Sequence, residues 1–324
     1  MRVTDGTNLD TRPAPDGQGQ VLIAVASLLG CGTLLALSTN LAKVANGFGI
    51  EPLPFLTWSL AGATLLLSTV ALFRGQRPVI NRRSIEYYVL AGFLSVAGAN
   101  LIFFNAVPRV GVSFVVLTIS LPPVLTYIAA LLMRMESFCS WRAAGVVLTL
   151  CGTSVLIAGQ WTAPGIDRFW IGLTLLGPVL LAAGNIYRTV RWPPGASAES
   201  LAPGMLFGAT ALLVIAALVM PVWSLDVPTS STQALSLIVV QVVIFAGQFL
   251  LLFILQKSGG PVFLSLTGAV AAVIGVPIAM IVLKESLLPA LLPGAALIGA
   301  GIINMVIGIR SCSPKIVKCS VHRV

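Results

Sequence analysis

The feature that most constrains this chain is an internal repeat. The segment from Asn105 to Gly159 recurs without gaps from Ile254 to Gly308, so that residue 105 corresponds to residue 254. Shared leucines arise easily by chance between apolar segments, but glycines and a Glu-Ser pair in fixed register indicate a duplication. The matched positions are Gly111 with Gly260, Phe114 with Phe263, Leu117-Thr118 with Leu266-Thr267, Glu136-Ser137 with Glu285-Ser286, Gly145 with Gly294, Gly152 with Gly301 and Gly159 with Gly308.

The repeat lies within a chain that is apolar almost throughout. Of its 324 residues 57% are hydrophobic and only 9% are charged, with a mean hydropathy of +1.00, which indicates an integral membrane protein. The apolar runs are continuous and do not alternate, so they predict membrane-spanning helices and not a barrel. We expect an all-α protein with ten spans, at about 20–42, 52–73, 86–106, 110–133, 140–159, 168–189, 202–223, 235–256, 261–283 and 288–309.

The distribution of basic residues predicts the orientation of these spans. With the amino terminus inside, fifteen lysines and arginines fall on the inner side and four on the outer side, which places both termini in the cytoplasm. The net charge of +9 therefore indicates membrane topology, and we expect no nucleic-acid partner. The four outer residues are Lys43, Arg109, Arg168 and Lys284.

The repeat and the spans together divide the chain into four parts. We expect a disordered cytoplasmic tail at residues 1–19, a five-helix repeat at 20–160, a second at 161–310 and a basic cytoplasmic tail at 311–324. Five is an odd number, so the second copy enters the membrane from the opposite face and the repeats are inverted. Inverted repeats around a central cavity can exchange two shapes and open that cavity to alternate sides, which is typical of carriers.

Several segments resemble the drug/metabolite transporter superfamily, in particular its ten-helix EamA-type branch. The resemblance covers about residues 20–310 and implies a multi-pass transporter of the cell membrane, or of the inner membrane in a Gram-negative cell. The chain departs from the family pattern at Leu29-Gly30-Cys31-Gly32 and around Trp58-Ser59. The segments that carry the resemblance are Ala106-Val107-Pro108-Arg109-Val110-Gly111-Val112, Leu132-Met133-Arg134-Met135-Glu136-Ser137 with Trp141 and Gly145, and Leu283-Lys284-Glu285-Ser286.

Uncharged polar residues near the middle of the spans are candidates for the solute path. An amide or hydroxyl in lipid is costly unless it is paired, so it points either to a neighbouring helix or to a water-filled cavity. The repeat places Asn100 and Gln248 at nearly equivalent positions, both facing the pseudo-twofold axis. The mid-depth candidates are Asn100, Thr118, Ser120, Gln248 and Thr267, with Tyr127 as a weaker one.

Two basic pairs mark the helix ends. Asn40 and Lys43 share a face near the outer end of the first span, and Asn185 and Arg188 do so near the inner end of the sixth. The pairs correspond at an offset of 145 residues, so the repeat would place them at opposite mouths of one cavity. They either form cationic vestibules for an anionic or zwitterionic solute, or they are cations that snorkel to the membrane surface at helix carboxyl ends.

Other residues have structural explanations. Glu136 and Glu285 follow the fourth and ninth spans, and we interpret each as a cap that accepts amide hydrogens at the start of the next helix. Prolines in these two spans predict bending, at Pro122, Pro123 and Pro277. The glycines at 145, 152 and 159, and at 294, 301 and 308, form small-residue stripes for close packing, within each half or between protomers.

The function that these features favour is a secondary active transporter, in first place an exporter of small polar organic metabolites such as amino acids. The alternatives are a membrane-embedded lipid-modifying enzyme and a non-transporting scaffold. No catalytic cluster, nucleotide-binding motif or metal-ligand spacing is present in the sequence, so we expect no enzyme activity, cofactor or metal. The expected partners are a small-molecule solute and the lipid bilayer, with a homodimer as an option.

Overall fold

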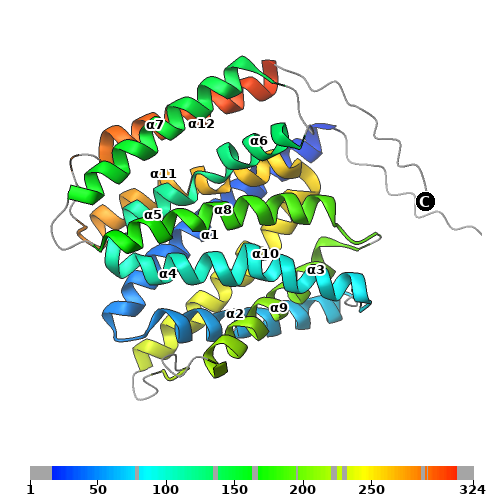
Figure 1. The fold of residues 1–324 in the computed structure, drawn as a ribbon. Coiled ribbons are helices and arrows are strands. Elements are labelled where there is room, and N and C mark those ends of the chain that lie inside the picture. Colours follow the sequence, from blue (N-terminus) through cyan, green and yellow to red (C-terminus); the bar gives the residue numbers. More distant parts are fainter. Residues whose placement is uncertain are drawn as a thin grey trace, which may run out of the picture.

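The computed structural model describes residues 17–76, 80–133, 138–162, 167–194, 196–219, 225–227, 232–285, 289 and 291–311. This part of the chain is helical and contains no strand, as expected (Figure 1). The helices are α1 (Gly17–Gly47), α2 (Pro52–Phe73), α3 (Arg82–Gly92), the π-helix η1 (Phe93–Ala97), α4 (Gly98–Val110), α5 (Val112–Ile119), α6 (Pro122–Leu132), α7 (Ser140–Thr162), α8 (Arg168–Val190), α9 (Ala198–Val219), α10 (Thr232–Ser265), α11 (Thr267–Ile281) and α12 (Leu291–Ser311).

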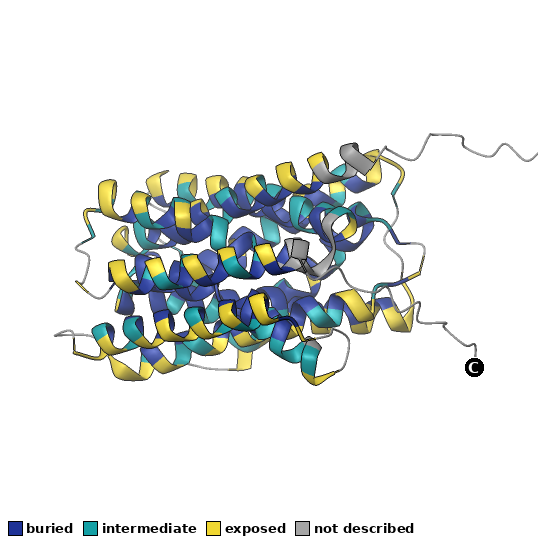
Figure 2. Cartoon of the chain, turned by 90° about the horizontal axis from the view of Figure 1, so that it is seen from above, coloured by how far each residue is buried: buried dark blue, intermediate teal, exposed yellow. Residues whose placement is uncertain are grey.

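The helices form a bundle whose outer surface is suited to lipid. By length and composition, nine stretches in the described ranges can cross a membrane, and the shorter α11 lies where the ninth of the ten expected spans was placed. Figure 2 shows exposed residues along the outward faces of the helices and buried residues between them. Many exposed side chains are large and apolar, for example Leu65, Phe73 and Leu218. A water-soluble protein would not expose so many of them.

The contacts between α7 and α12 show that the two repeats are related by a twofold axis. A Cβ added to Gly145 would lie 2.6 Å from the carbonyl oxygen of Gly301, and one added to Gly152 would lie 2.7 Å from that of Gly294. Gly145 corresponds to Gly294 and Gly152 to Gly301, so each contact is the image of the other. The glycine stripes therefore pack one repeat against the other, and not helices within one half or of two protomers as expected.

The packing of α1 shows how the chain reverses between α10 and α11. As the residue numbers along α1 increase, those of the contacted residues decrease on α10 and increase on α11. Helix α10 is therefore antiparallel to α1, and α11 is parallel to α1. The contacts are Gly30 with Leu251 and Leu34 with Gly247 on α10, and Gly32 with Val270 and Asn40 with Gly275 on α11. The eighth and ninth spans are thus antiparallel, as the sequence predicts.

The reversal occurs without the loop that the gap between the expected spans 235–256 and 261–283 predicts. Helical hydrogen bonding continues through Ser258-Gly259-Gly260 to Ser265, whereas Gly111, the counterpart of Gly260, has a φ of +88° and separates α4 from α5. Glycine in a helix costs only about 1 kcal/mol relative to alanine, so a glycine pair permits a break but does not enforce one. Residues 134–137, which contain the counterpart of Glu285, lie outside the described ranges.

Other boundaries differ from the prediction because side chains cap the helices. Asn81 accepts a hydrogen bond from the Ser84 amide, 2.7 Å, and starts α3 at Arg82. Ser197 accepts one from the Ser200 amide, 3.2 Å, so α9 starts at Ala198, before Pro203. Helix α1 begins within the segment expected to be a tail, and tail residues 1–16 and 312–324 lie outside the described part. The beginning of α1 and the end of α12 lie on the same side of the bundle (Figure 1).

Candidate functional site

A cavity of about 60 Å³ lies inside the bundle, where both repeats contribute to its wall. The wall is mixed, with aliphatic and aromatic side chains and a group of amides, hydroxyls and one guanidinium. Its residues are Leu35, Ser95, Asn100, Phe103, Ile119, Pro122, Leu181, Asn185, Arg188, Gln248, Phe249, Leu252, Leu264, Thr267 and Gly268. Pairs of equivalent positions occur in this wall, which shows that the cavity lies at the pseudo-twofold axis. Examples are residues 100 and 249, 103 and 252, and 119 and 268.

Two broken helices meet at the cavity. The fourth span is interrupted between α5 and α6, and the ninth between α10 and α11. Ile119 and Gly268, which flank these breaks, occupy equivalent positions and are in contact. A Cβ on Gly268 would overlap the carbonyl oxygen of Ile119, so only glycine allows this approach. Broken helices near the middle of the membrane are typical of transporter binding sites.

The prolines expected to bend these spans differ in their effect. Pro122 and Pro123 occupy the first two positions of α6, directly after the break. Proline lacks the amide hydrogen that would continue α5, and it fits the first turn of a new helix. Pro277 instead lies inside the continuous α11, and the interruption of the ninth span is at Leu266. The break of the ninth span thus lies away from Pro277, and the expected bending at the three prolines stays a prediction.

Five of the ten residues proposed from the sequence line the cavity. They are Asn100, Asn185, Arg188, Gln248 and Thr267. Asn100 donates to the carbonyl oxygen of Val96 at 2.9 Å, and Thr267 to that of Leu264 at 2.8 Å, so both reach the wall while bonded to their own helix region. Asn100 and Gln248, expected to face the axis together, both line this cavity, and their contact with solute stays a prediction.

The other five proposed residues lie outside this cavity. Asn40 donates to the carbonyl oxygens of Ala36 and Gly275, and Lys43 is half-buried on α1. Thr118 is bonded within α5, and Ser120 faces a separate apolar groove between α5, α11 and α12. The hydroxyl of Tyr127 accepts a hydrogen bond from the Cys139 amide, 3.0 Å, and its ring packs against Val124 and Met305. Their part in the solute path stays a prediction.

The cavity occupies one half of the bundle only. Asn185 and Arg188 line it near the end of α8, whereas their repeat counterparts Asn40 and Lys43 do not. The same holds for Thr267 and its counterpart Thr118, which is buried in α5. The half toward the end of α8 is thus hollow, whereas the counterparts in the half near the carboxyl end of α11, which we call the packed half, are buried or half-buried against neighbouring helices. Two repeats of related sequence therefore adopt different local packing.

Glu285 closes the packed half by a contact between the repeats. Its Oε2 accepts hydrogen bonds from the amide and the hydroxyl of Ser113, both 3.2 Å, at the first turn of α5. Lys284, with a φ of +50°, turns the chain so that Glu285 faces α5 and not the next helix. The interpretation as a helix cap is therefore right in chemistry, but the capped helix belongs to the other repeat. The amino end of α5 attracts the carboxylate.

Ser95 is a cavity residue that the sequence pattern did not reveal. It lies in the π-helix η1, where one turn is wider than in an α-helix, and its hydroxyl has no hydrogen-bond partner among the described residues. Gly184 on α8 allows the approach, because a Cβ there would overlap the Ser95 hydroxyl. Single-turn π-helices occur frequently at functional sites. No sequence periodicity distinguishes such a turn, although serine and two flanking glycines at 92 and 98 mark the region.

The described residues contain no group of histidine, cysteine, aspartate or glutamate side chains that could hold a metal ion. The site instead offers amides, hydroxyls and one buried cation, which can bind a small polar solute by hydrogen bonds. Nine apolar spans and the shorter α11 in the described ranges, with a polar cavity between broken helices, are features typical of multi-pass membrane transporters.

Comparison with known proteins finds a similarity to one transporter family. Residues 22–158, which include most of the first repeat, match the EamA-like transporter family, consistent with membership of the drug/metabolite transporter superfamily. A solved structure titled "Crystal structure of protein" superposes with a TM-score of 0.62 at 17% identity, over 91% of this chain and 100% of that one, which shows a shared fold. No curated protein matches the chain. The apolar helices and the family match indicate a multi-pass membrane protein, and the members of the matched family are transporters.

Proposed function

We propose that this protein is a secondary active transporter that exports small polar organic metabolites, such as amino acids, by alternating access. The observation that carries the proposal is the one-sided cavity at the pseudo-twofold axis. Inverted repeats that exchange their packing would close the hollow half and open the packed half. A solute bound between the broken helices would then face the other side of the membrane.

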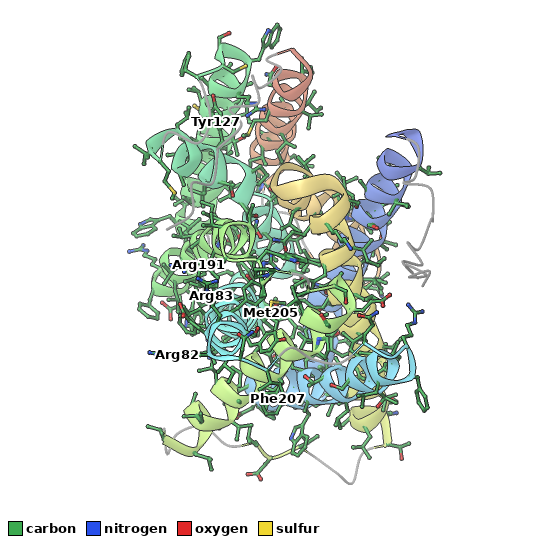
Figure 3. The ribbon with its side chains drawn as sticks, turned by 90° about the vertical axis from the view of Figure 1, so that its right-hand side faces the viewer. Arg82, Arg83, Tyr127, Arg191, Met205 and Phe207 are labelled. Carbon is green, nitrogen blue, oxygen red and sulfur yellow. The ribbon has the colours of Figure 1, made fainter. Side chains whose placement is uncertain are left out.

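The position of the cavity supports export. It extends toward the end of the bundle where α8 ends and α3 begins, and Figure 3 shows Arg82, Arg83 and Arg191 on one side of this end. All three side chains are exposed. Basic residues concentrate on the cytoplasmic side of membrane proteins, so we place this end and both termini in the cytoplasm and the protein in the cell membrane, which is the inner membrane in a Gram-negative cell. A solute would load from inside.

The experiment is solute flux in proteoliposomes, with two matched asparagines as variants. Asn100 and Asn105 both lie on α4 and both donate to the carbonyl oxygen four residues earlier, at 2.9 Å. Only Asn100 lines the cavity. We expect Asn100→Leu to lower flux of labelled amino acids and related metabolites by about tenfold, from the loss of one or two hydrogen bonds to solute, and Asn105→Leu to leave it unchanged.

The proposal also predicts sidedness. Flux should be faster from the face that carries the α3 and α8 ends, assigned by protease cleavage of a tag on the carboxyl terminus. If empty and protein-containing liposomes release every tested solute at the same rate, the transport proposal is refuted. Equal effects of the two asparagine variants would refute the cavity as the solute path.

A further inference from the structure

Arg188 is a fully buried cation with most of its hydrogen-bonding capacity unused. Its side chain is 1% exposed although it lies two residues from the end of α8, so it does not snorkel to the membrane surface. Nη2 donates to Oδ1 of Asn185 at 2.8 Å, while Nε and Nη1 have no hydrogen-bond partner among the described residues. A buried guanidinium without an anionic partner is strongly unfavourable, which indicates that a partner binds there.

The surroundings of Arg188 do not supply a negative charge. The residues that line the cavity include no aspartate or glutamate. The ring of Phe253 lies 6.0 Å from the guanidinium carbon, which is a weak contact for a cation. The Asn185 oxygen that accepts from Nη2 is neutral. Among the described lining residues, Arg188 therefore carries the one full charge, and this charge is positive.

The remaining groups of the wall are complementary to a small polar molecule. Oε1 of Gln248 and Oγ of Ser95 are buried without partners, and both residues line the same cavity as Arg188. The cavity is much smaller than the roughly 300–1,000 Å³ of sites for drug-sized ligands, so it suits a compact solute. An anionic group at Arg188 and a polar group near Gln248 and Ser95 would satisfy these atoms together.

A carboxylate fits this arrangement better than a phosphate. A guanidinium and a carboxylate are both planar and can form two parallel hydrogen bonds, either from Nε with Nη2 or from Nη1 with Nη2. Asn185 takes one of the two Nη2 hydrogens, and Nε and Nη1 of Arg188 are unused, so one of these pairs stays free. The guanidinium and the carboxylate are neutral together, whereas a dianionic phosphate would leave a buried negative charge beside a single cation. Resting on the transport function proposed above, we propose that Arg188 binds the carboxylate of the solute, so that the protein selects small carboxylate-bearing solutes, including amino acids.

The test uses pairs of solutes that differ only in the carboxylate. Purified full-length protein in detergent is heated with lactate or lactamide, alanine or alaninamide, succinate or succinamide, and with inorganic phosphate, and the unfolding midpoint is recorded. Uptake of the labelled carboxylates is measured in proteoliposomes. We expect at least one carboxylate to raise the midpoint more than its amide and more than phosphate does.

Variants at two neighbouring arginines assign the effect to the site. Arg188→Gln should weaken binding of the carboxylate by about 10- to 100-fold and leave binding of the amide unchanged, because two charge-assisted hydrogen bonds are lost. Arg188→Lys keeps the charge without the paired geometry and should retain part of the preference. Arg191→Gln removes an exposed charge one turn on and should behave as the unaltered protein.

Each result bears on one of the two proposals. The inference is overturned if no carboxylate stabilises the protein more than its amide, if phosphate is preferred, or if Arg188→Gln keeps the carboxylate preference. Should Arg188→Gln fail to fold, Arg188→Lys decides by the same comparison. Carboxylate-dependent stabilisation without flux of any solute would support the binding site and count against transport, so the failures are distinguishable.

Discussion

Replacing Glu285 by glutamine tests whether the contact with Ser113 keeps one half of the cavity closed. The variant preserves the size and shape of the side chain but removes its charge. In the structure the carboxylate accepts two hydrogen bonds from Ser113, each 3.2 Å, at the amino end of α5. These bonds join the end of the ninth span to the start of the fourth, so they must break when this half opens.

The size of the effect follows from the two hydrogen bonds. A hydrogen bond to a charged group contributes about 1.5–3 kcal/mol and a neutral one about 0.5–1.5 kcal/mol, so losing the charge costs about 1 kcal/mol per bond. Glu285 is partly exposed, and we therefore add nothing for its interaction with the helix dipole. The closed half should be destabilised by about 2 kcal/mol relative to the open one, which is about a 30-fold change in their ratio.

The assay is the rate at which a buried cysteine reacts with N-ethylmaleimide. Val115 on α5 is 0% exposed in the packed half, and Val115→Cys is introduced after the native cysteines are replaced by alanine. Reaction requires opening, so its rate reports the open fraction. We expect Glu285→Gln to speed the reaction by about 30-fold.

Glu199→Gln is the matched control for this experiment. Glu199 also binds a donor of a distant helix, Arg74 at 2.7 Å, but this ion pair is at the surface and contributes at most about 1 kcal/mol. The control should change the rate by less than about threefold, because the pair does not close the cavity. Equal rates for the two variants would refute the reasoning, because the Glu285 contact would then be no more than a local cap.

Three further predictions concern the backbone. Gly152→Ala should destabilise the protein by about 1–3 kcal/mol, because the new Cβ would lie 2.7 Å from a carbonyl oxygen of α12. Gly299→Ala should leave the stability unchanged, because a Cβ there would meet open space. Thermal unfolding in detergent compares the two variants. Lys284→Gly should leave the stability unchanged, and Lys284→Val should destabilise the protein by about 1–2 kcal/mol, because the φ of +50° disfavours branched side chains. Thermal unfolding measures both variants, and equal midpoints would contradict this prediction. Pro122→Ala and Pro277→Ala should both slow turnover in the flux assay. The effect of Pro122→Ala should be stronger, because Pro122 lies at a helix break. Unchanged transport rates in both variants would exclude a role of these prolines in motion.

The sequence predicted the elements of this fold that depend on repetition. The ungapped copy indicated two five-helix units, and their inversion followed from the odd number of spans. Because equivalent residues of inverted repeats face one axis, the repeat register alone placed Asn100 and Gln248 at the same cavity. Hydropathy and a simple symmetry were sufficient for these conclusions.

The features that the sequence did not predict depend on tertiary packing. The sequence treated the Asn40–Lys43 and Asn185–Arg188 pairs as equivalent, but only the second lines a cavity in this conformation. Repeat symmetry identifies which residues are equivalent, but it does not predict the conformation that each repeat adopts. Likewise, the partner of Glu285 is 172 positions away, and no local pattern identifies it.

The meeting of Ile119 and Gly268 has a consequence for how the two copies can vary. Their positions are equivalent, yet the same spot on the axis can hold only one bulky side chain, because the backbones of the two broken spans touch there. A perfectly symmetrical ancestor with isoleucine at both sites could not pack in this way. In this packing at least one of the two equivalent positions must therefore be glycine, so the two halves cannot both carry a larger side chain there.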